Sequence, residues 1–104
     1  MAWIYLAIAG VLEVVWAFAM KQSQGLARPG FAALTVLAMI ASLALLAHAM
    51  KSLPLGTAYT IWTGIGAVGA FLVGVLVLGE PAGAIRIAAA VLIVSGLALL
   101  KLSG

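Results

Sequence analysis

The sequence predicts an all-α integral membrane protein, and three observations support this fold class. Hydrophobic residues make up 67% of the 104 positions and charged residues only 7%, against roughly 25% charged in ordinary soluble domains. A small soluble chain needs polar residues to cover its large relative surface. Four apolar segments have about the 20 residues that a helix needs to cross the hydrocarbon layer. Glycine and proline residues separate these segments.

In chain order the four predicted transmembrane helices span residues 2–20, 31–50, 57–78 and 82–100, so residues 1–104 are interpreted as a single four-helix domain. Pro29, Pro54 and Pro81 lie in the three connections. Because these connections are short, we expect successive helices to run antiparallel and both termini to lie on one side of the membrane. A signal peptide is the alternative for the first segment, but no positive charge precedes it and three further spans follow.

The basic residues are divided almost evenly between the two membrane faces. Lys51 and Lys101 belong to the side of the termini, and Lys21, Arg28 and Arg86 to the other. Cytoplasmic loops normally carry an excess of Lys and Arg, so a difference of one residue scarcely sets an orientation. We therefore expect insertion in both directions and an antiparallel homodimer. Two opposite copies would supply the inverted symmetry that is common among transporters.

The composition and one motif also exclude several partners and cofactors. The basic residues occur singly near span ends, which argues against nucleic-acid binding. The chain has no cysteine, so no thiolate metal site is expected. The run GIGAVG places glycines at Gly64, Gly66 and Gly69 like a dinucleotide fingerprint, but that motif needs a preceding strand and here lies within an apolar helix. We expect neither a metal nor another cofactor.

Glu13 is the most informative residue of the chain. It lies near the middle of the first span, and no Lys or Arg inside any predicted span is placed to pair with it. A charged group at that depth costs at least about 2.5 kcal/mol on insertion scales. A protonated Glu that joins helices by hydrogen bonds is one interpretation. We favour a site where a proton and a cationic substrate bind, because a structural protein gains little from such a residue.

Helical periodicity predicts the surroundings of Glu13. Residues three and four apart share a helix face, so Gly10 lies one turn before Glu13 and Trp16 about one turn after it. On the third span, Tyr59 and Trp62 form a second stripe. These side chains suit hydrogen bonding to a buried carboxylate and cation–π contact with a ligand. A position in the aromatic belt at the membrane interface is the alternative.

Three further polar residues are assigned by their depth in the spans. Ser42 lies deep in the second span, and its hydroxyl is expected either to bond a carbonyl of its own helix or to point at Glu13. His48 lies near the end of that span and is interpreted as interfacial rather than as a proton relay. Glu80 precedes Pro81 in a connection and is expected to be solvated.

Small residues mark candidate helix contacts in the third and fourth spans. Gly64 and Gly66 permit either close packing or a bend, provided that neighbouring helices satisfy the backbone. Ala89 and Gly96 lie seven residues apart on one face of the fourth span. They predict a small-residue seam suited to contact with another helix.

Two stretches, GVLEVVWA around Glu13 and KSLPLGTAYTIWTGIGAVGA across residues 51–70, resemble the small multidrug resistance family of proton-coupled exporters, in particular its guanidinium-exporting members. The resemblance runs nearly end to end. It implies an antiparallel, dual-topology dimer in the inner (plasma) membrane, with one central site shared by both copies of Glu13. It also implies a bend in the third span and a dimer held by the fourth. The site-lining residues that it implies are Gly10, Trp16, Ser42, Tyr59 and Trp62.

Three classes of function remain at this stage. A channel is disfavoured because one mid-depth carboxylate per chain gives no evident conduction path. A structural subunit would not need Glu13 together with three aromatic residues. We therefore predict a secondary active transporter, not an enzyme, that exchanges protons for guanidinium and small substituted guanidinium cations. Its expected partners are a second copy of the chain, the cation, protons and the lipid bilayer. Export of quaternary ammonium or polyaromatic drug cations is the alternative.

Overall fold

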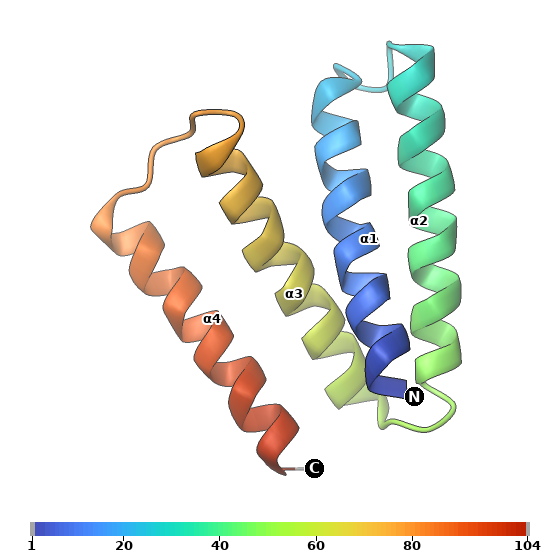
Figure 1. Ribbon diagram of the computed structural model, residues 1–104, viewed down its shortest axis with the longest axis vertical. Helices are drawn as coiled ribbons and strands as arrows, with labels where there is room; N and C mark the ends of the chain where they lie inside the picture. Colours follow the sequence, from blue (N-terminus) through green and yellow to red (C-terminus); the bar gives the residue numbers. More distant parts are fainter. Residues whose placement is uncertain (1, 104) are drawn as a thin grey trace.

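The computed structural model describes residues 2–103, and this part of the chain folds into four α-helices without a strand. Successive helices run up and down (Figure 1). Each helix is long and apolar enough to cross a membrane. The predicted fold class, an all-α membrane protein of four helices, is therefore confirmed, whereas the single-domain division of residues 1–104 stays a prediction. The helices are α1 (Ala2–Gln22), α2 (Pro29–Ala49), α3 (Leu55–Leu76) and α4 (Ala84–Ser103).

The helix bounds differ from the predicted spans by a few residues. α2 begins at Pro29, which was assigned to the connection, because proline fits the first turn of a helix, where its missing N–H would have no partner. α3 begins at Leu55 directly after Pro54 and ends at Leu76, before the left-handed Gly79 (φ 71°). α4 begins only at Ala84, after Pro81. α1 and α4 also extend beyond their predicted ends, to Gln22 and Ser103, because the polar residues Lys21 and Lys101 continue the helix.

The connection between α1 and α2 is a tight turn organised by Ser23. The buried Ser23 hydroxyl donates a hydrogen bond to the Met20 carbonyl (2.6 Å) and accepts one from the Leu26 N–H (2.9 Å). Gly25 adopts a φ of 75°, the left-handed region that glycine tolerates best. This turn holds α1 and α2 antiparallel and side by side. The start of α1 and the end of α4 both lie at the end of the molecule opposite this turn (Figure 1).

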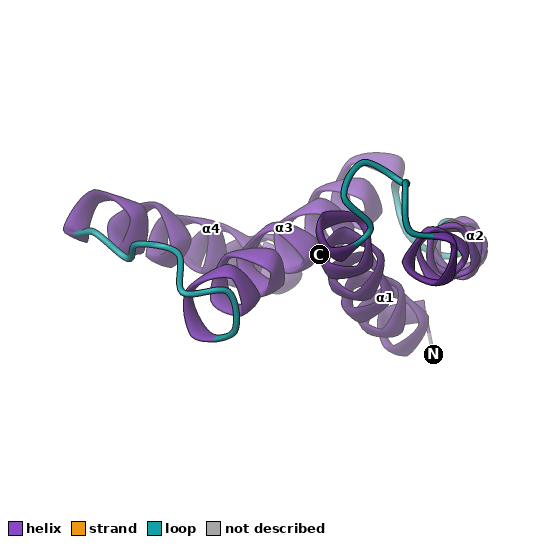
Figure 2. Ribbon diagram, turned by 90° about the horizontal axis from the view of Figure 1, so that it is seen from above, coloured by secondary structure: helices purple, strands orange, loops and turns teal. Residues whose placement is uncertain are grey.

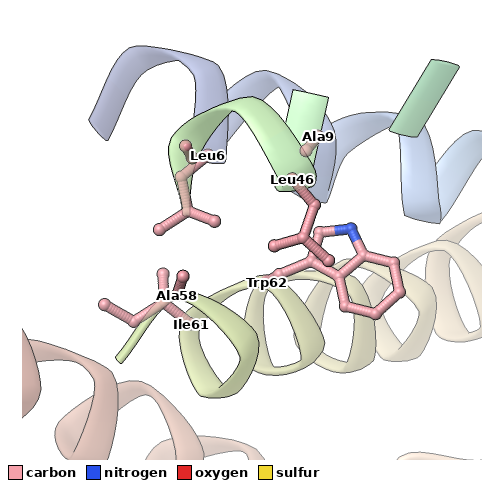
Figure 3. Packing of buried hydrophobic residues seen from close by; sticks show 7 residues of the cluster. Leu6, Ala9, Leu46, Ala58, Ile61 and Trp62 are labelled. Atoms are coloured by element: carbon pink, nitrogen blue, oxygen red, sulfur yellow. The ribbon is translucent and has the colours of Figure 1, made fainter. Parts of the chain in front are cut away.

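A small hydrophobic core joins α1, α2 and α3 near the termini. Leu6 and Ala9 of α1 meet Leu46 of α2 and Trp62 of α3 there (Figure 3). Ala9 is completely buried, and its small side chain lets the helices approach closely. Between apolar helices in lipid, this kind of close packing replaces the hydrophobic effect as the force of association. The core therefore fixes how α1, α2 and α3 present their polar side chains.

The fourth helix lies at the edge of this core and, among its described residues, reaches it only through Leu97 and Leu100. Within residues 2–103, α4 packs its backbone against α3 and not against α1 or α2, and none of its residues is buried. One side-chain contact reaches α1, where Lys101 Nζ lies 5.2 Å from the centre of the Trp3 ring. Seen from above, the helices form an open row rather than a closed bundle (Figure 2). Large apolar side chains such as Ile85, Leu92 and Leu102 are more than two-thirds exposed. Lipid or another protein surface can cover them at little cost.

Candidate functional site

Glu13 lies at the close approach of α1 and α3. Its carboxylate rests against Gly66 of α3, where a β-carbon would overlap the Glu13 side chain from Cγ to Oε1. The Oε1 atom is buried and has no hydrogen-bond partner in the described part of the chain. Because Glu13 lies near the centre of the 21-residue helix α1, this unpaired oxygen lies deep in the expected membrane span.

Trp16 carries a second unpaired polar atom about one turn further along α1. Its indole Nε1 is buried and, among residues 2–103, has no acceptor. Buried polar groups without a partner cost about 1–3 kcal/mol each, so most are paired in folded proteins. Here an acceptor on Glu13 and a donor on Trp16 are both unpaired on one face of the helix. Such a pair marks a place where a ligand or another chain can bind.

Glycines make room for the seam between α1 and α3. Gly10 is covered by Ile65, whose Cγ2 would lie 2.5 Å from a β-carbon at Gly10, and Gly69 receives the Val14 side chain. With Gly66 against Glu13, these contacts bring the two backbones together. Gly10 therefore makes a helix contact in the single chain, and its role in lining a substrate site stays a prediction.

Gly64 faces the opposite way from this seam. The side chain of Leu97 on α4 covers it, and a β-carbon there would lie 2.5 Å from Leu97 Cδ2. The run from Gly64 to Gly69 lies inside the continuous helix α3, as expected for an apolar helix rather than for a nucleotide-binding turn. Of the two predicted roles for Gly64 and Gly66, the structure shows close packing, while a bend of α3 stays a prediction.

Ser42 joins three helices by hydrogen bonds. Its buried hydroxyl donates to the Ala9 carbonyl of α1 (2.7 Å) and accepts from the Trp62 indole Nε1 of α3 (2.9 Å). Both expected partners of Ser42, a carbonyl of its own helix and Glu13, are therefore wrong. The small Ala9 residue brings the α1 backbone within reach, so the hydroxyl bonds across the helix contact. In this arrangement Trp62 directs its N–H at Ser42 and not at Glu13.

Tyr59 occupies a different environment from Glu13. Its ring lies 5.6 Å from the Trp62 ring, centre to centre, but the residue is 53% exposed. It lines a groove of about 550 Å³ between α3 and α4, which Gly64 and Gly96 also border. The structure thus places Glu13 and Trp16 about one turn apart on one face of α1, without a hydrogen bond between them, and joins Ser42 to Trp62, whereas Tyr59 faces the α4 side. Its contact with a substrate stays a prediction.

The predicted small-residue seam lies on the exposed surface of α4. Ala89 and Gly96 are both exposed, and no atom lies within 4 Å of the position that a β-carbon would take at Gly96. Both residues border grooves between α3 and α4, and the space at Gly96 leaves room there for another helix. Its role as a dimer contact stays a prediction.

Two polar residues outside the predicted site also have defined surroundings. His48, which was interpreted as interfacial, is exposed near the end of α2. Its ring lies edge-on to the Tyr5 ring of α1, with 4.6 Å between the ring centres. Glu80 was expected to be solvated, and it is only partly so, because it is half buried with its carboxylate against Gly74. The left-handed Gly79 turns the chain back over the end of α3 and produces this contact. The sequence signal was the Gly-Glu-Pro run after the third span, which was interpreted only as a break.

The four apolar helices and the deep, unpaired carboxylate define a multi-pass membrane protein with a polar site inside its helices. A family model described as Small Multidrug Resistance protein matches residues 1–93. The chain belongs to this family, whose setting in bacteria is the inner membrane.

Curated relatives match almost the whole chain. It is 59% identical over 103 residues to a guanidinium exporter of Escherichia coli O6:H1 (strain CFT073), covering 99% of this chain and 98% of the relative. The guanidinium exporter of Salmonella typhimurium (strain LT2) is 55% identical, with the same coverage. That of Yersinia pseudotuberculosis serotype I (strain IP32953) is 54% identical, covering 99% of each chain.

Proposed function

We propose that this protein exports guanidinium and small substituted guanidinium cations in exchange for protons that bind Glu13. The near full-length identity to guanidinium exporters supports the substrate class. The single observation that carries the mechanism is the buried Glu13 Oε1 without a hydrogen-bond partner in the described chain. A carboxylate in that position is able to bind one positive ligand at a time, either a proton or a cation.

Guanidinium suits this site in shape and in hydrogen bonding. It is planar and weakly hydrated, and its N–H groups meet the two oxygens of a carboxylate as a fork. Trp16 follows Glu13 by about one turn on the same helix face, and in the proposed site its ring would attract a flat cation. A quaternary ammonium ion has no N–H donor, so it would leave Glu13 Oε1 without a hydrogen bond. These properties favour guanidinium over the alternative drug cations.

Competition for Glu13 accounts for exchange. A cation binds when the proton has left, and a proton binds when the cation has left, so each release prepares the site for the other ligand. Net transport against a gradient further requires that the empty site seldom changes its exposure from one side to the other. An empty, charged Glu13 deep in the membrane is the most costly state of the cycle, which disfavours that step.

We further propose that the working unit is an antiparallel homodimer in which two copies of Glu13 share one site. Lys51 lies in the α2–α3 connection, at the end of the molecule where Lys101 also lies, and the other three bases belong to the opposite end. This small difference permits both orientations. The lack of buried residues in α4, with Ala89 and Gly96 both exposed, supports a helix contact between copies. In such a dimer the exposed Tyr59 of each copy would be free to approach the shared site, together with the Ser42–Trp62 pair.

The test is transport by the purified protein in vesicles with an imposed pH gradient. Guanidinium is expected to exchange for protons, while a planar polyaromatic cation in the same vesicles moves slowly. The Glu13→Gln protein, checked for its folded state, serves as the control and should show no gradient-driven exchange. Faster exchange of the polyaromatic cation would favour drug export instead. Conductance without coupling would point to a channel.

A further inference from the structure

A second acidic side chain lies in a groove between α1 and α3, at the end of the molecule away from the termini. Glu80 borders this groove together with Lys21 and Val14 of α1 and Ala70 and Gly74 of α3. Its volume is about 200 Å³, below the roughly 300–1,000 Å³ typical of sites for drug-sized ligands. A groove of this size suits a cation with few atoms, such as guanidinium.

The backbone after α3 is shaped to hold Glu80 in this groove. Gly79 adopts a φ of 71°, and the Glu80 N–H donates to the Gly74 carbonyl at 2.9 Å, so the chain folds back over the helix end. Gly74 is buried and has no side chain, and a β-carbon there would overlap Glu80 Oε1. The carboxylate therefore lies against the helix because Gly74 leaves room for it.

The groove and the Glu13 site occupy the same α1–α3 seam. Val14, which borders the groove, packs against Gly69 and directly follows Glu13 in the sequence. Lys21 marks the outer part of the groove on α1, and the eight residues from Glu13 to Lys21 correspond to about 12 Å of helix. Glu80 and Glu13, the chain's two acidic residues, are thus placed along one seam, with Glu13 near its middle and Glu80 at the end away from the termini.

We propose that Glu80 is a cation-entry residue, which holds guanidinium-class cations in this groove on their way to and from Glu13. This inference rests on the proposed function. Lys21, Arg28 and Arg86 make this end of the molecule basic, so an approaching cation meets repulsion. A carboxylate held in the groove offsets that repulsion locally and raises the cation concentration at its mouth. Glu80 thereby determines how readily the substrate reaches the site.

The experiment measures the apparent KM and the maximal rate for guanidinium in vesicles at two ionic strengths. With Glu80→Gln we expect KM to rise about threefold to tenfold at low salt. At about 1 M salt, where charges are screened within about 3 Å, the difference should nearly vanish. The maximal rate should be unchanged, because the carboxylate of Glu13 is untouched.

Two further variants test the position of the carboxylate rather than the loss of a charge. Gly74→Ala keeps every charge but displaces the flexible Glu80 side chain, so it should raise KM as Glu80→Gln does. Gly83→Ala, in the same connection but with open space around it, is the matched control and should leave KM unchanged. Lys21→Gln removes a positive charge from the groove and should lower KM, so the proposal stays testable even if Glu80→Gln fails to fold.

The outcomes separate this inference from the proposed function. If the unaltered protein does not transport guanidinium, the proposed function fails and the entry role fails with it. If it does, an unchanged low-salt KM in Glu80→Gln and Gly74→Ala refutes the entry role alone. A lower maximal rate at constant KM would also refute it, since Glu80 would then act in the conformational step. Labelling of the C-terminus from each side should show that orientation is unchanged, because acidic residues influence it little.

Discussion

Replacing Gly66 by alanine should move the Glu13 carboxylate while leaving its charge in place. A β-carbon at Gly66 would lie 2.7 Å from Glu13 Cγ and would overlap the carboxylate itself, whereas ordinary van der Waals contact begins at 3.4 Å. The Glu13 side chain must therefore rotate out of its present position. Because Gly66 lies within a regular helix, alanine fits its backbone without strain. The substitution thus tests the geometry of the site and not the chemistry of the carboxylate.

The expected magnitude follows from the fork that a guanidinium forms with a well-placed carboxylate. A hydrogen bond to a charged group contributes about 1.5–3 kcal/mol, and each 1.4 kcal/mol is a factor of ten in affinity. We expect Gly66→Ala to weaken guanidinium binding by about 10- to 100-fold in titration calorimetry of the purified protein. Gly56→Ala, in the same helix but with open space around it, should bind as the unaltered protein does. Equal affinity in the two variants would refute the assignment of Glu13 as the binding residue.

Three further predictions concern coupling, orientation and stability. The apparent affinity for guanidinium should weaken as pH falls, because protons occupy the same carboxylate oxygens. In a binding titration over pH, Glu13→Gln should remove this dependence. A pH dependence that persists in Glu13→Gln would contradict competition. Two or three lysines added at one end should force a single orientation, which labelling of the C-terminus from each side would detect. The singly oriented protein should not transport until an oppositely biased copy is co-expressed. A wild-type C-terminus found on one side only would contradict dual topology. Ser42→Ala should lower the unfolding free energy in bicelles by about 0.6–1.7 kcal/mol. Ser95→Ala, which loses only a bond to Val91 of its own exposed helix face, should change it little, and equal effects would show that the Ser42 bonds add nothing.

The membrane spans were readable from the sequence because the bilayer sets them directly. A helix must remain apolar for about 20 residues, so composition and length identified all four helices and the depth of Glu13. The bounds were less accurate where a residue has two roles. Pro29 reads as a break, yet proline also fits the first turn of a helix, and α2 begins there.

The contacts around the site were less predictable, because they depend on how the helices cross. Gly64 and Gly66 are two residues apart, so they lie on nearly opposite sides of a helix with 3.6 residues per turn. One faces α4 and the other faces Glu13, but the sequence alone does not show which helix covers each side. The partner of Ser42 depends in the same way on the close approach of α1 and α2 at Ala9.

The unpaired Glu13 oxygen gives the proposed exchange a physical basis. In the empty, charged site Glu13 Oε1 is buried without a partner, which costs about 1–3 kcal/mol for a polar group and more for a charge. A proton neutralises Glu13, and a guanidinium both neutralises it and donates hydrogen bonds to its oxygens. Either ligand therefore lowers the energy of the site relative to its empty form. An exchanger needs this order of energies, because two stable loaded states and one unstable empty state keep proton and cation movements coupled.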